Sequence, residues 1–182
     1  MFLKNCWYVA AWDHEVTAAP LARTLLCEPV VLYRTEDGTA VALEDRCCHR
    51  ALPLSMGKVV GDRLQCGYHG LEFDSGGACV QVPGQAYIPP GASVRSYPIV
   101  ERWKYLWIWM GDPALADEAL IPNWWWFDHP EWEVVKGKYL RLDCNYELIT
   151  DNLLDLSHLS YVHLQTLGTT DITEFPIKTE RE

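Results

Sequence analysis

Two short motifs that pair a cysteine with a histidine constrain this chain more than any other feature of its sequence. The first reads Cys-Cys-His-Arg at residues 47–50, and the second reads Cys-Gly-Tyr-His-Gly at residues 66–70. Together they offer two thiols and two imidazoles, which belong to Cys47, His49, Cys66 and His69. Such a set suits either tetrahedral zinc or a [2Fe–2S] cluster in which two histidines replace two cysteines on one iron. The motifs therefore predict a metal centre held between two loops.

The order of the donors separates these two kinds of metal centre. Zinc fingers with two cysteines and two histidines place the cysteines together and the histidines together, the latter on a helix. In this chain each cysteine precedes its own histidine, and the neighbouring turn residues predict loops between strands. Two matching loops around a two-iron cluster fit this order better than zinc does. Four incidental core residues are the weakest explanation, because both motifs pair a cysteine with a histidine at a ligand-like spacing.

The composition of the chain argues against some kinds of binding partner and indicates the cellular compartment. The net charge of −10 argues against a nucleic acid or an anionic membrane as partner, since both require a basic surface. The first twelve residues lack the features of a signal peptide, and no segment approaches the roughly 20 apolar residues of a membrane span. We expect a cytoplasmic protein. The seven cysteines are then better explained by metal binding than by a disulfide framework.

Residues 21–111 read as short strands separated by turns. Residues 29–33 and 40–43 flank Glu-Asp-Gly at 36–38, which predicts a hairpin, and further reversals are expected at 61–62 and 74–77. Residues 102–110 carry aromatic side chains at every second position with apolar residues between them. This pattern predicts one strand that is buried on both faces.

The remainder of the chain predicts a second, α+β domain. Residues 112–130 resemble an interdomain connection with an aromatic anchor at 124–126, and residues 132–142 alternate like a strand. From about residue 146 the apolar spacing becomes helical, with Thr150 or Asp151 near the helix start. We therefore expect an all-β domain over residues 1–122 and the beginning of another domain over 123–182.

The helical segment holds a second group of polar side chains. Asn152, Asp155 and His158 follow at i+3 steps, each turned by roughly 60° on a continuous helix. His163 lies five residues after His158, so an ideal helix would separate the two imidazoles by roughly 140°. Both can bind one ion only if the helix is bulged or interrupted. Two histidines with a carboxylate are typical of non-haem Fe(II) oxygenases, whereas the residues alone leave incidental histidines equally plausible.

The first pair of motifs resembles the Rieske motif of ring-hydroxylating and demethylating oxygenases, usually Cys-Pro-His-Arg followed by Cys-x-Tyr-His-Gly. The resemblance makes Cys47, His49, Cys66 and His69 the cluster ligands. Cys48 stands where proline is usual and is expected to be a bystander. Respiratory Rieske proteins carry an extra cysteine in each loop, and the corresponding residues here are Leu52 and Tyr68. A cluster of the oxygenase or ferredoxin kind is implied.

Residues 151–163 are similar to the iron-binding helix of the same family, and residues 5–10 and 107–113 extend the resemblance over essentially the whole chain. It implies a helix-grip catalytic domain after the Rieske domain, and the closest subgroup is the vanillate O-demethylase type. His158 and His163 would bind a mononuclear Fe(II), with Asn152 beside them in a supporting role. Asp155 would bridge His69 of one subunit to His158 of the next and carry electrons between the metal centres.

The function implied is that of the oxygenase component of a Rieske monooxygenase that demethylates or hydroxylates a small aromatic substrate with O2. An NAD(P)H-dependent reductase or a ferredoxin would supply electrons, and a homotrimer is expected. The alternatives are a Rieske ferredoxin without catalytic iron, a ring-hydroxylating dioxygenase and a zinc-stabilised binding module. In this family the catalytic domain continues well beyond the position of Glu182, and its third iron ligand is a later aspartate. Asp171 and Glu174 are not expected to replace it.

Overall fold

The computed structural model describes residues 2–166, 168 and 180 and divides into two compact units, Met1–Gly137 and Lys138–Glu182. Strands and 3-10 turns build the first unit, and the second contains two α-helices. The α+β class expected from the sequence is confirmed. The division falls later in the chain than the boundary expected after residue 122, which stays a prediction. No helix among these described residues is both long and apolar enough to cross a membrane.

The first unit has a sheet in the order β1-β10-β9, with β1 at Cys6–Trp12, β9 at Ile99–Arg102 and β10 at Tyr105–Met110. Residues 106–110 are all buried, as the two-faced pattern predicts. The predicted single strand over 102–110 was wrong, however, because Trp103 and Lys104 form the turn of a hairpin. Both have positive φ, 58° and 64°, the backbone that a two-residue hairpin turn requires.

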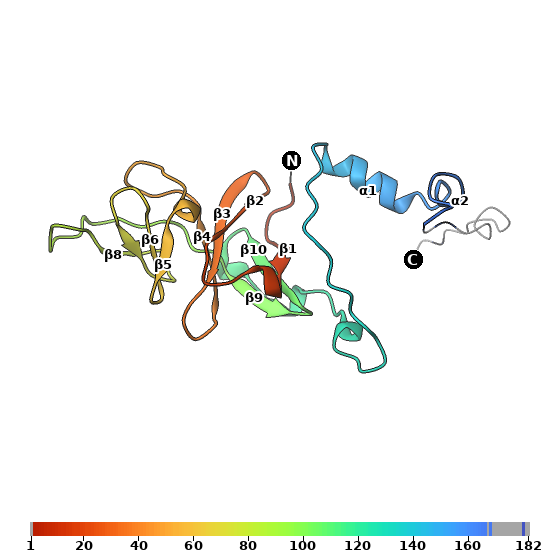
Figure 1. Ribbon diagram of the computed structural model, residues 1–182, viewed down its shortest axis with the longest axis horizontal. Coiled ribbons are helices and arrows are strands. Elements are labelled where there is room, and N and C mark those ends of the chain that lie inside the picture. Colours follow the sequence, from red (N-terminus) through yellow and green to blue (C-terminus); the bar gives the residue numbers. More distant parts are fainter. Residues whose placement is uncertain (1, 167, 169–179, 181–182) are drawn as a thin grey trace. The chain divides into compact units, whose positions relative to one another are not determined.

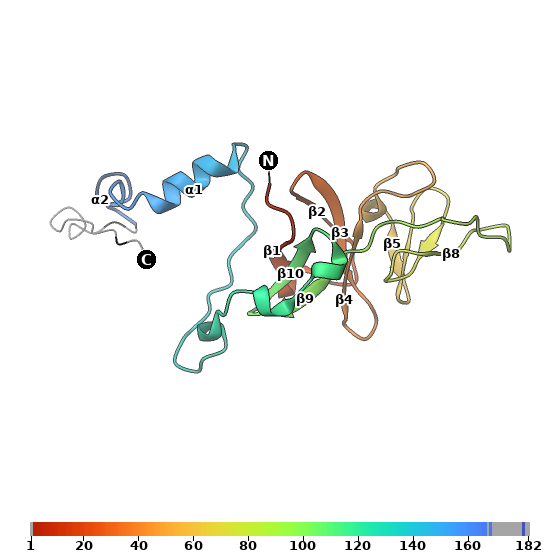
Figure 2. The same ribbon diagram turned by 180° about the vertical axis from the view of Figure 1, so that it is seen from behind.

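The middle sheet has the order β2-β3-β4, with β2 at Leu21–Leu25, β3 at Glu28–Arg34 and β4 at Ala40–Glu44. The predicted hairpin at 36–38 is confirmed. Val30 and Leu32 enter one apolar core, whereas Val31 and Tyr33 enter another, because successive side chains of a strand point to opposite faces. Figures 1 and 2 show this sheet between the other two sheets of the unit. It therefore separates two cores.

The third sheet carries both cysteine–histidine motifs in its connections. Its antiparallel order is β5-β6-β7-β8, with β5 at Lys58–Val60, β6 at Arg63–Gln65, β7 at Glu72–Phe73 and β8 at Cys79–Gln81. The predicted reversals at 61–62 and 74–77 are confirmed. The first motif follows β4, and the second joins β6 to β7, so both belong to one end of the first unit.

Short 3-10 turns complete the first unit: η1 at Asp13–Glu15, η2 at Leu54–Met56, η3 at Pro113–Leu115, η4 at Glu118–Leu120 and η5 at Trp125–Phe127. Trp124 anchors the segment after β10. Its ring lies 5.0 Å from that of Trp107 and 5.7 Å from that of Tyr105, measured between centroids. Trp124 thus packs on β10, whereas Trp125 and Trp126 are exposed.

The chain after residue 131 departs from the sequence prediction at three points. Residues 132–142 form no strand, because an alternating pattern describes how side chains face and supplies no backbone partner. α1 begins at Tyr146, before Thr150, since the Asn145 side chain accepts a hydrogen bond from the Glu147 N–H and caps it. The helix is also not continuous: α1 is Tyr146–Leu154 and α2 is Leu159–Val162.

Candidate metal centres

Two loops of the first unit have the same backbone construction. The Cys47 N–H donates to the Leu52 carbonyl, and the Ala51 N–H donates back to the Cys47 carbonyl, both at 2.9 Å. In the second loop the Cys66 N–H donates to the Leu71 carbonyl at 2.8 Å, and the Gly70 N–H donates to the Cys66 carbonyl at 3.1 Å. Each loop is therefore a tight turn closed at its own cysteine. This repeat supports the predicted symmetry of the two motifs.

The four candidate cluster ligands divide into a buried pair and an exposed pair. Cys47 and Cys66 are 3% and 2% exposed and belong to one apolar core. His49 and His69 are exposed, and their ring centroids are 4.7 Å apart. Tyr68 stacks on His69 at 3.9 Å. The loops thus present two sulfurs toward the interior and two imidazoles toward solvent.

This donor set fits a [2Fe–2S] cluster with one cysteine-bound and one histidine-bound iron. Burial, together with the neighbouring Cys66 thiol, raises the pKa of Cys47 to about 11. The Cys47 thiol is therefore protonated at neutral pH unless a metal replaces its proton. All seven cysteines are free thiols, including those at the base of the loops. Thiolate ligands below and imidazoles above are the arrangement that a Rieske cluster requires.

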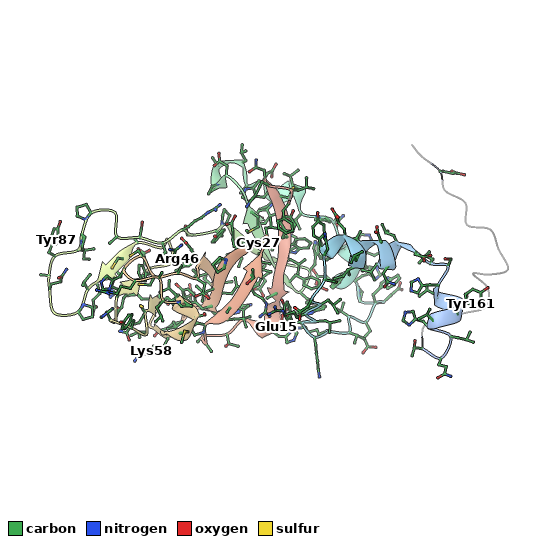
Figure 3. All side chains as sticks on the ribbon, turned by 90° about the horizontal axis from the view of Figure 1, so that it is seen from above. Glu15, Cys27, Arg46, Lys58, Tyr87 and Tyr161 are labelled. Carbon is green, nitrogen blue, oxygen red and sulfur yellow. The ribbon has the colours of Figure 1, made fainter. Side chains whose placement is uncertain are left out.

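Cys48 lies outside this arrangement. Its side chain is exposed, and it lines a cavity of about 580 Å³ together with His49 and His69. The opposite wall is the loop 82–92, which contains three prolines and no charged residue. Figure 3 shows Arg46, Lys58 and Tyr87 at this end of the first unit. The histidine edges are therefore open to a second molecule.

The second candidate centre lies where α1 gives way to α2. His158 precedes α2 and His163 follows it, and their ring centroids are 5.3 Å apart. The break between α1 and α2 lies before His158, and α2 ends at His163, whose backbone has left the helical region (φ −111°, ψ 17°). Among the described residues the buried Nδ1 atom of His158 has no hydrogen-bond partner and faces Oδ2 of Asp155, which leaves Nε2 as the nitrogen that can bind a metal.

Asp155 explains the interruption of the helix. Its Oδ1 accepts a hydrogen bond from the Ser157 N–H at 2.9 Å and another from the Ser157 hydroxyl. This local turn competes with the helix for the backbone, so the predicted continuous stripe of Asn152, Asp155 and His158 was wrong. The same two donors hold the pKa of Asp155 below its usual range. Its Oδ2 lies 3.7 Å from His158 Nδ1, beyond a hydrogen bond.

The other candidates contribute less. Asn152 is exposed on α1. Asp171 and Glu174 lie outside the described residues. Across the described part of the chain, no three histidine, cysteine or acidic side chains converge on one point as a finished metal cage. The candidate donors instead lie in pairs: Cys47 with Cys66, His49 with His69, and His158 with His163.

Comparison with known proteins agrees with this geometry. Residues 6–98, which contain both loops, match the model of the Rieske [2Fe–2S] domain. The chain belongs to the Rieske [2Fe–2S] domain family. A [2Fe–2S] cluster is thus its expected metal group. Residues 142–182 match the vanillate O-demethylase oxygenase C-terminal domain, so the resemblance seen in the sequence to that subgroup of Rieske oxygenases is confirmed.

Similar proteins are oxygenase components. The iron-sulfur subunit of the toluene-4-sulfonate monooxygenase system of Comamonas testosteroni is 53% identical over 100% of this Rieske chain and 52% of its own length. The oxygenase component of dicamba O-demethylase from Stenotrophomonas maltophilia is 52% identical over 89% and 48%. A crystal structure of dicamba monooxygenase with non-heme iron and dicamba superposes with a TM-score of 0.81 at 51% identity, over 86% and 48%. The chain spans about half the length of these relatives.

Sequence reasoning missed two buried carboxylates beside the loops. Asp45 and Glu72 are 7% and 5% exposed. Asp45 precedes Cys47 by one intervening residue, and Glu72 closes the second loop by accepting a hydrogen bond from Gln65 at 2.9 Å. The sequence marks each of them only as an acidic residue beside or within a short apolar strand. That pattern does not show whether a carboxylate is buried or exposed.

Proposed function

We propose that this chain supplies the electron-accepting cluster and two iron ligands of a Rieske monooxygenase that acts on a small aromatic substrate. The observation that carries the proposal is the presence of two separate imidazole pairs in one chain. His49 and His69 face each other above two buried thiols, and His158 and His163 face each other across one helical turn. Residues 1–122 would form the cluster domain, and residues 123–182 would begin the catalytic domain.

In this proposal Cys47 and Cys66 hold the inner iron of the cluster, and His49 and His69 hold the outer iron. When bound, the cluster accepts and releases one electron at a time. The protein confines that exchange to the histidine edge, because the thiols are buried and the imidazoles are exposed. The open cavity beside the imidazoles leaves space for another polypeptide to approach them.

His158 and His163 would bind a mononuclear iron, as suggested by the non-heme iron of dicamba monooxygenase. Asn152, on the preceding helix, would support that site. Asp155 would connect the iron to a cluster of the neighbouring subunit. Its side chain is 54% exposed, and Oδ2 is turned toward His158 while Oδ1 is held by Ser157. A second imidazole, His69 of the neighbouring subunit, could therefore reach the same carboxylate. This bridge requires a closed oligomer, for which we propose a homotrimer.

The proposed chemistry consumes O2, two electrons and two protons for each aromatic methyl ether. The methoxyl carbon is hydroxylated, the hemiacetal collapses to a phenol and formaldehyde, and the second oxygen atom leaves as water. An NAD(P)H-dependent reductase or a ferredoxin in the cytoplasm would supply the electrons. The names of the relatives suggest aromatic acids as substrates, since dicamba and toluene-4-sulfonate each combine a ring with an acidic group. A methyl group on the ring would be hydroxylated by the same stoichiometry.

Two measurements test this function. We expect the purified 182-residue chain, reconstituted with iron and sulfide, to be coloured and to give a Rieske electron paramagnetic resonance (EPR) signal after reduction. A colourless zinc protein would contradict the proposal. Iron beyond the two ions of the cluster, lost when His158 and His163 are both replaced by alanine, separates an oxygenase from a Rieske ferredoxin.

Turnover identifies the reaction class. A chimera that continues after Glu182 with the matching half of dicamba O-demethylase should release formaldehyde from an aromatic methyl ether. Formation of a cis-diol instead would favour a dioxygenase.

A further inference from the structure

The short segment between the two ligand loops contacts both of them. At one end, the buried carboxylate of Asp45 accepts two hydrogen bonds from Ser55. The Ser55 N–H donates to Oδ1 at 2.7 Å, and the Ser55 hydroxyl donates to Oδ2 at 2.6 Å. Since Cys47 lies between these two residues in sequence, the bonds close the base of the first loop over the η2 turn.

At its other end, the same segment lies against the second loop. A Cβ atom on Gly67, the residue after Cys66, would lie only 2.7 Å from the Met56 carbonyl oxygen. A Cβ atom on Gly57 would clash with the carbonyl oxygen of Gln65. The two backbones approach too closely for any side chain, and both contacts flank Cys66. Residues 55–57 therefore connect the base of one loop to the base of the other.

Burying the Asp45 carboxylate costs more free energy than burying an apolar side chain at the same place. Its presence indicates that the position of Ser55 is important. Its two partners are neutral, and among the described residues it takes part in no ion pair. A buried carboxylate without a counter-ion loses much of its hydration energy, so a packed apolar residue would be the cheaper core element. Two charge-assisted hydrogen bonds in fixed directions supply what an apolar contact lacks, which is a defined orientation of the segment.

We propose that Ser55, held by Asp45, is a positioning residue that sets the distance and angle between the two cluster-binding loops. The inference rests on the proposed function, since it assigns a role toward the cluster. The path runs from Asp45 through Ser55 to the backbone of residues 56 and 57, and from there to the backbone around Cys66. Neither side chain binds the metal group. Asp45 and Ser55 instead determine whether the two loops, which are closed as separate turns, are correctly placed to bind one cluster.

The test uses the 182-residue chain reconstituted with iron and sulfide. Ser55→Ala removes one hydrogen bond to a charged group, a loss that corresponds to about a tenfold change in an equilibrium constant. We expect the cluster to assemble, the EPR g-values and the visible circular dichroism to shift, and cluster loss to a chelator to become about tenfold faster. Ser55→Thr keeps the hydroxyl and should restore all three. Asp45→Asn removes the charge: its Oδ1 can still accept from the Ser55 N–H, whereas its Nδ2 can only donate to the Ser55 hydroxyl, so its effects should fall between those of the other two variants.

Two matched controls separate positioning from stability. Ser93→Ala makes the same change beside the first loop, where the hydroxyl donates only to the exposed Gly91 carbonyl at 3.4 Å. Ile108→Val weakens the other core, which contains neither Cys47 nor Cys66. Both should keep the wild-type spectra.

Wild-type g-values and chelator rates in Ser55→Ala would overturn the inference, and so would equal shifts in Ile108→Val. If Ser55→Ala does not fold, Asp45→Asn with wild-type spectra and rates overturns it instead. Absence of a Rieske spectrum in the wild-type chain would mean that the proposed function itself has failed, which is a distinct result.

Discussion

The two candidate metal centres of this chain are built in different ways. The cluster loops are closed by backbone hydrogen bonds, their thiols are buried in a core, and buried carboxylates tie their bases. His158 and His163 stand at the ends of a four-residue helix, within a unit whose large apolar side chains are mostly exposed. The first centre has its geometry fixed by tertiary packing. The second relies on local contacts alone in the described residues.

The strongest test of this contrast is removal of one buried thiol. We expect Cys66→Ser to abolish the cluster, because the hydroxyl is a poor iron ligand. Visible absorption and iron content measure the loss. Cys79→Ser is the matched control, since Cys79 is also buried in this core and donates only to the Gln81 carbonyl. A retained cluster in Cys66→Ser would refute the ligand assignment.

Asp155→Asn tests the electron bridge proposed for the second centre. In the chimera with dicamba O-demethylase, the variant should keep both iron centres and lose most of its turnover, because the amide keeps the shape and loses the charge. Rapid cluster reduction with stalled formaldehyde release is the expected signature in stopped-flow experiments. Asp151→Asn, one helical turn earlier, is the control. Normal turnover in Asp155→Asn would reduce Asp155 to a residue that shapes the turn with Ser157.

His69→Cys distinguishes the outer ligands from the inner ones. A cluster should still form, with a redox midpoint lower by on the order of 100 mV or more, because a thiolate stabilises the ferric state more than an imidazole does. Protein-film voltammetry measures the midpoint, and His129→Cys, outside both loops, supplies the control. An unchanged midpoint in His69→Cys would remove His69 from the ligand set.

Acid sensitivity should belong to the first unit. Lys4 lowers the pKa of Glu28 below its ordinary 4.5, and the Tyr97 hydroxyl and Arg95 act in the same direction against the effect of burial. A folded-state pKa below the unfolded value means that this stabilisation is present above about pH 4.5 and is lost as the pH falls through the folded-state pKa. Glu28→Gln should lower the urea midpoint at pH 7 by an amount equivalent to ~1 kcal/mol, a difference that should be smaller at about pH 3. An equal difference at both pH values would contradict this.

The smallest effect is expected at Cys48. Cys48→Pro restores the residue usual in the family and should leave cluster content and spectra unchanged, because the thiol is exposed and stands outside the proposed ligand set. Iron and sulfide analysis against the wild type measures the content. Loss of the cluster would show that the first loop uses Cys48 and that the pairing of Cys47 with His49 is wrong.

The sequence alone was sufficient for the motifs, the β character of the first unit and the change to helix near residue 146. These features depend on short-range chemistry: ligand spacing, turn residues and the period of apolar side chains. It was equally sufficient for the choice between zinc and a [2Fe–2S] cluster, because the order of the four donors differs between the two.

Tertiary structure decided what local patterns leave open. The turn at Trp103 and Lys104 contains no glycine or asparagine, and only pairing of β9 with β10 forces its positive φ. The interruption of the helix at Asp155 is an exception, because it comes from local bonds to Ser157 that the apolar spacing does not reveal. Asp45 is ten residues from Ser55 and Glu72 is seven from Gln65, yet each carboxylate is hydrogen-bonded to that partner in the folded chain. Burial and hydrogen bonding depend on which segments meet, and that is a property of the folded chain.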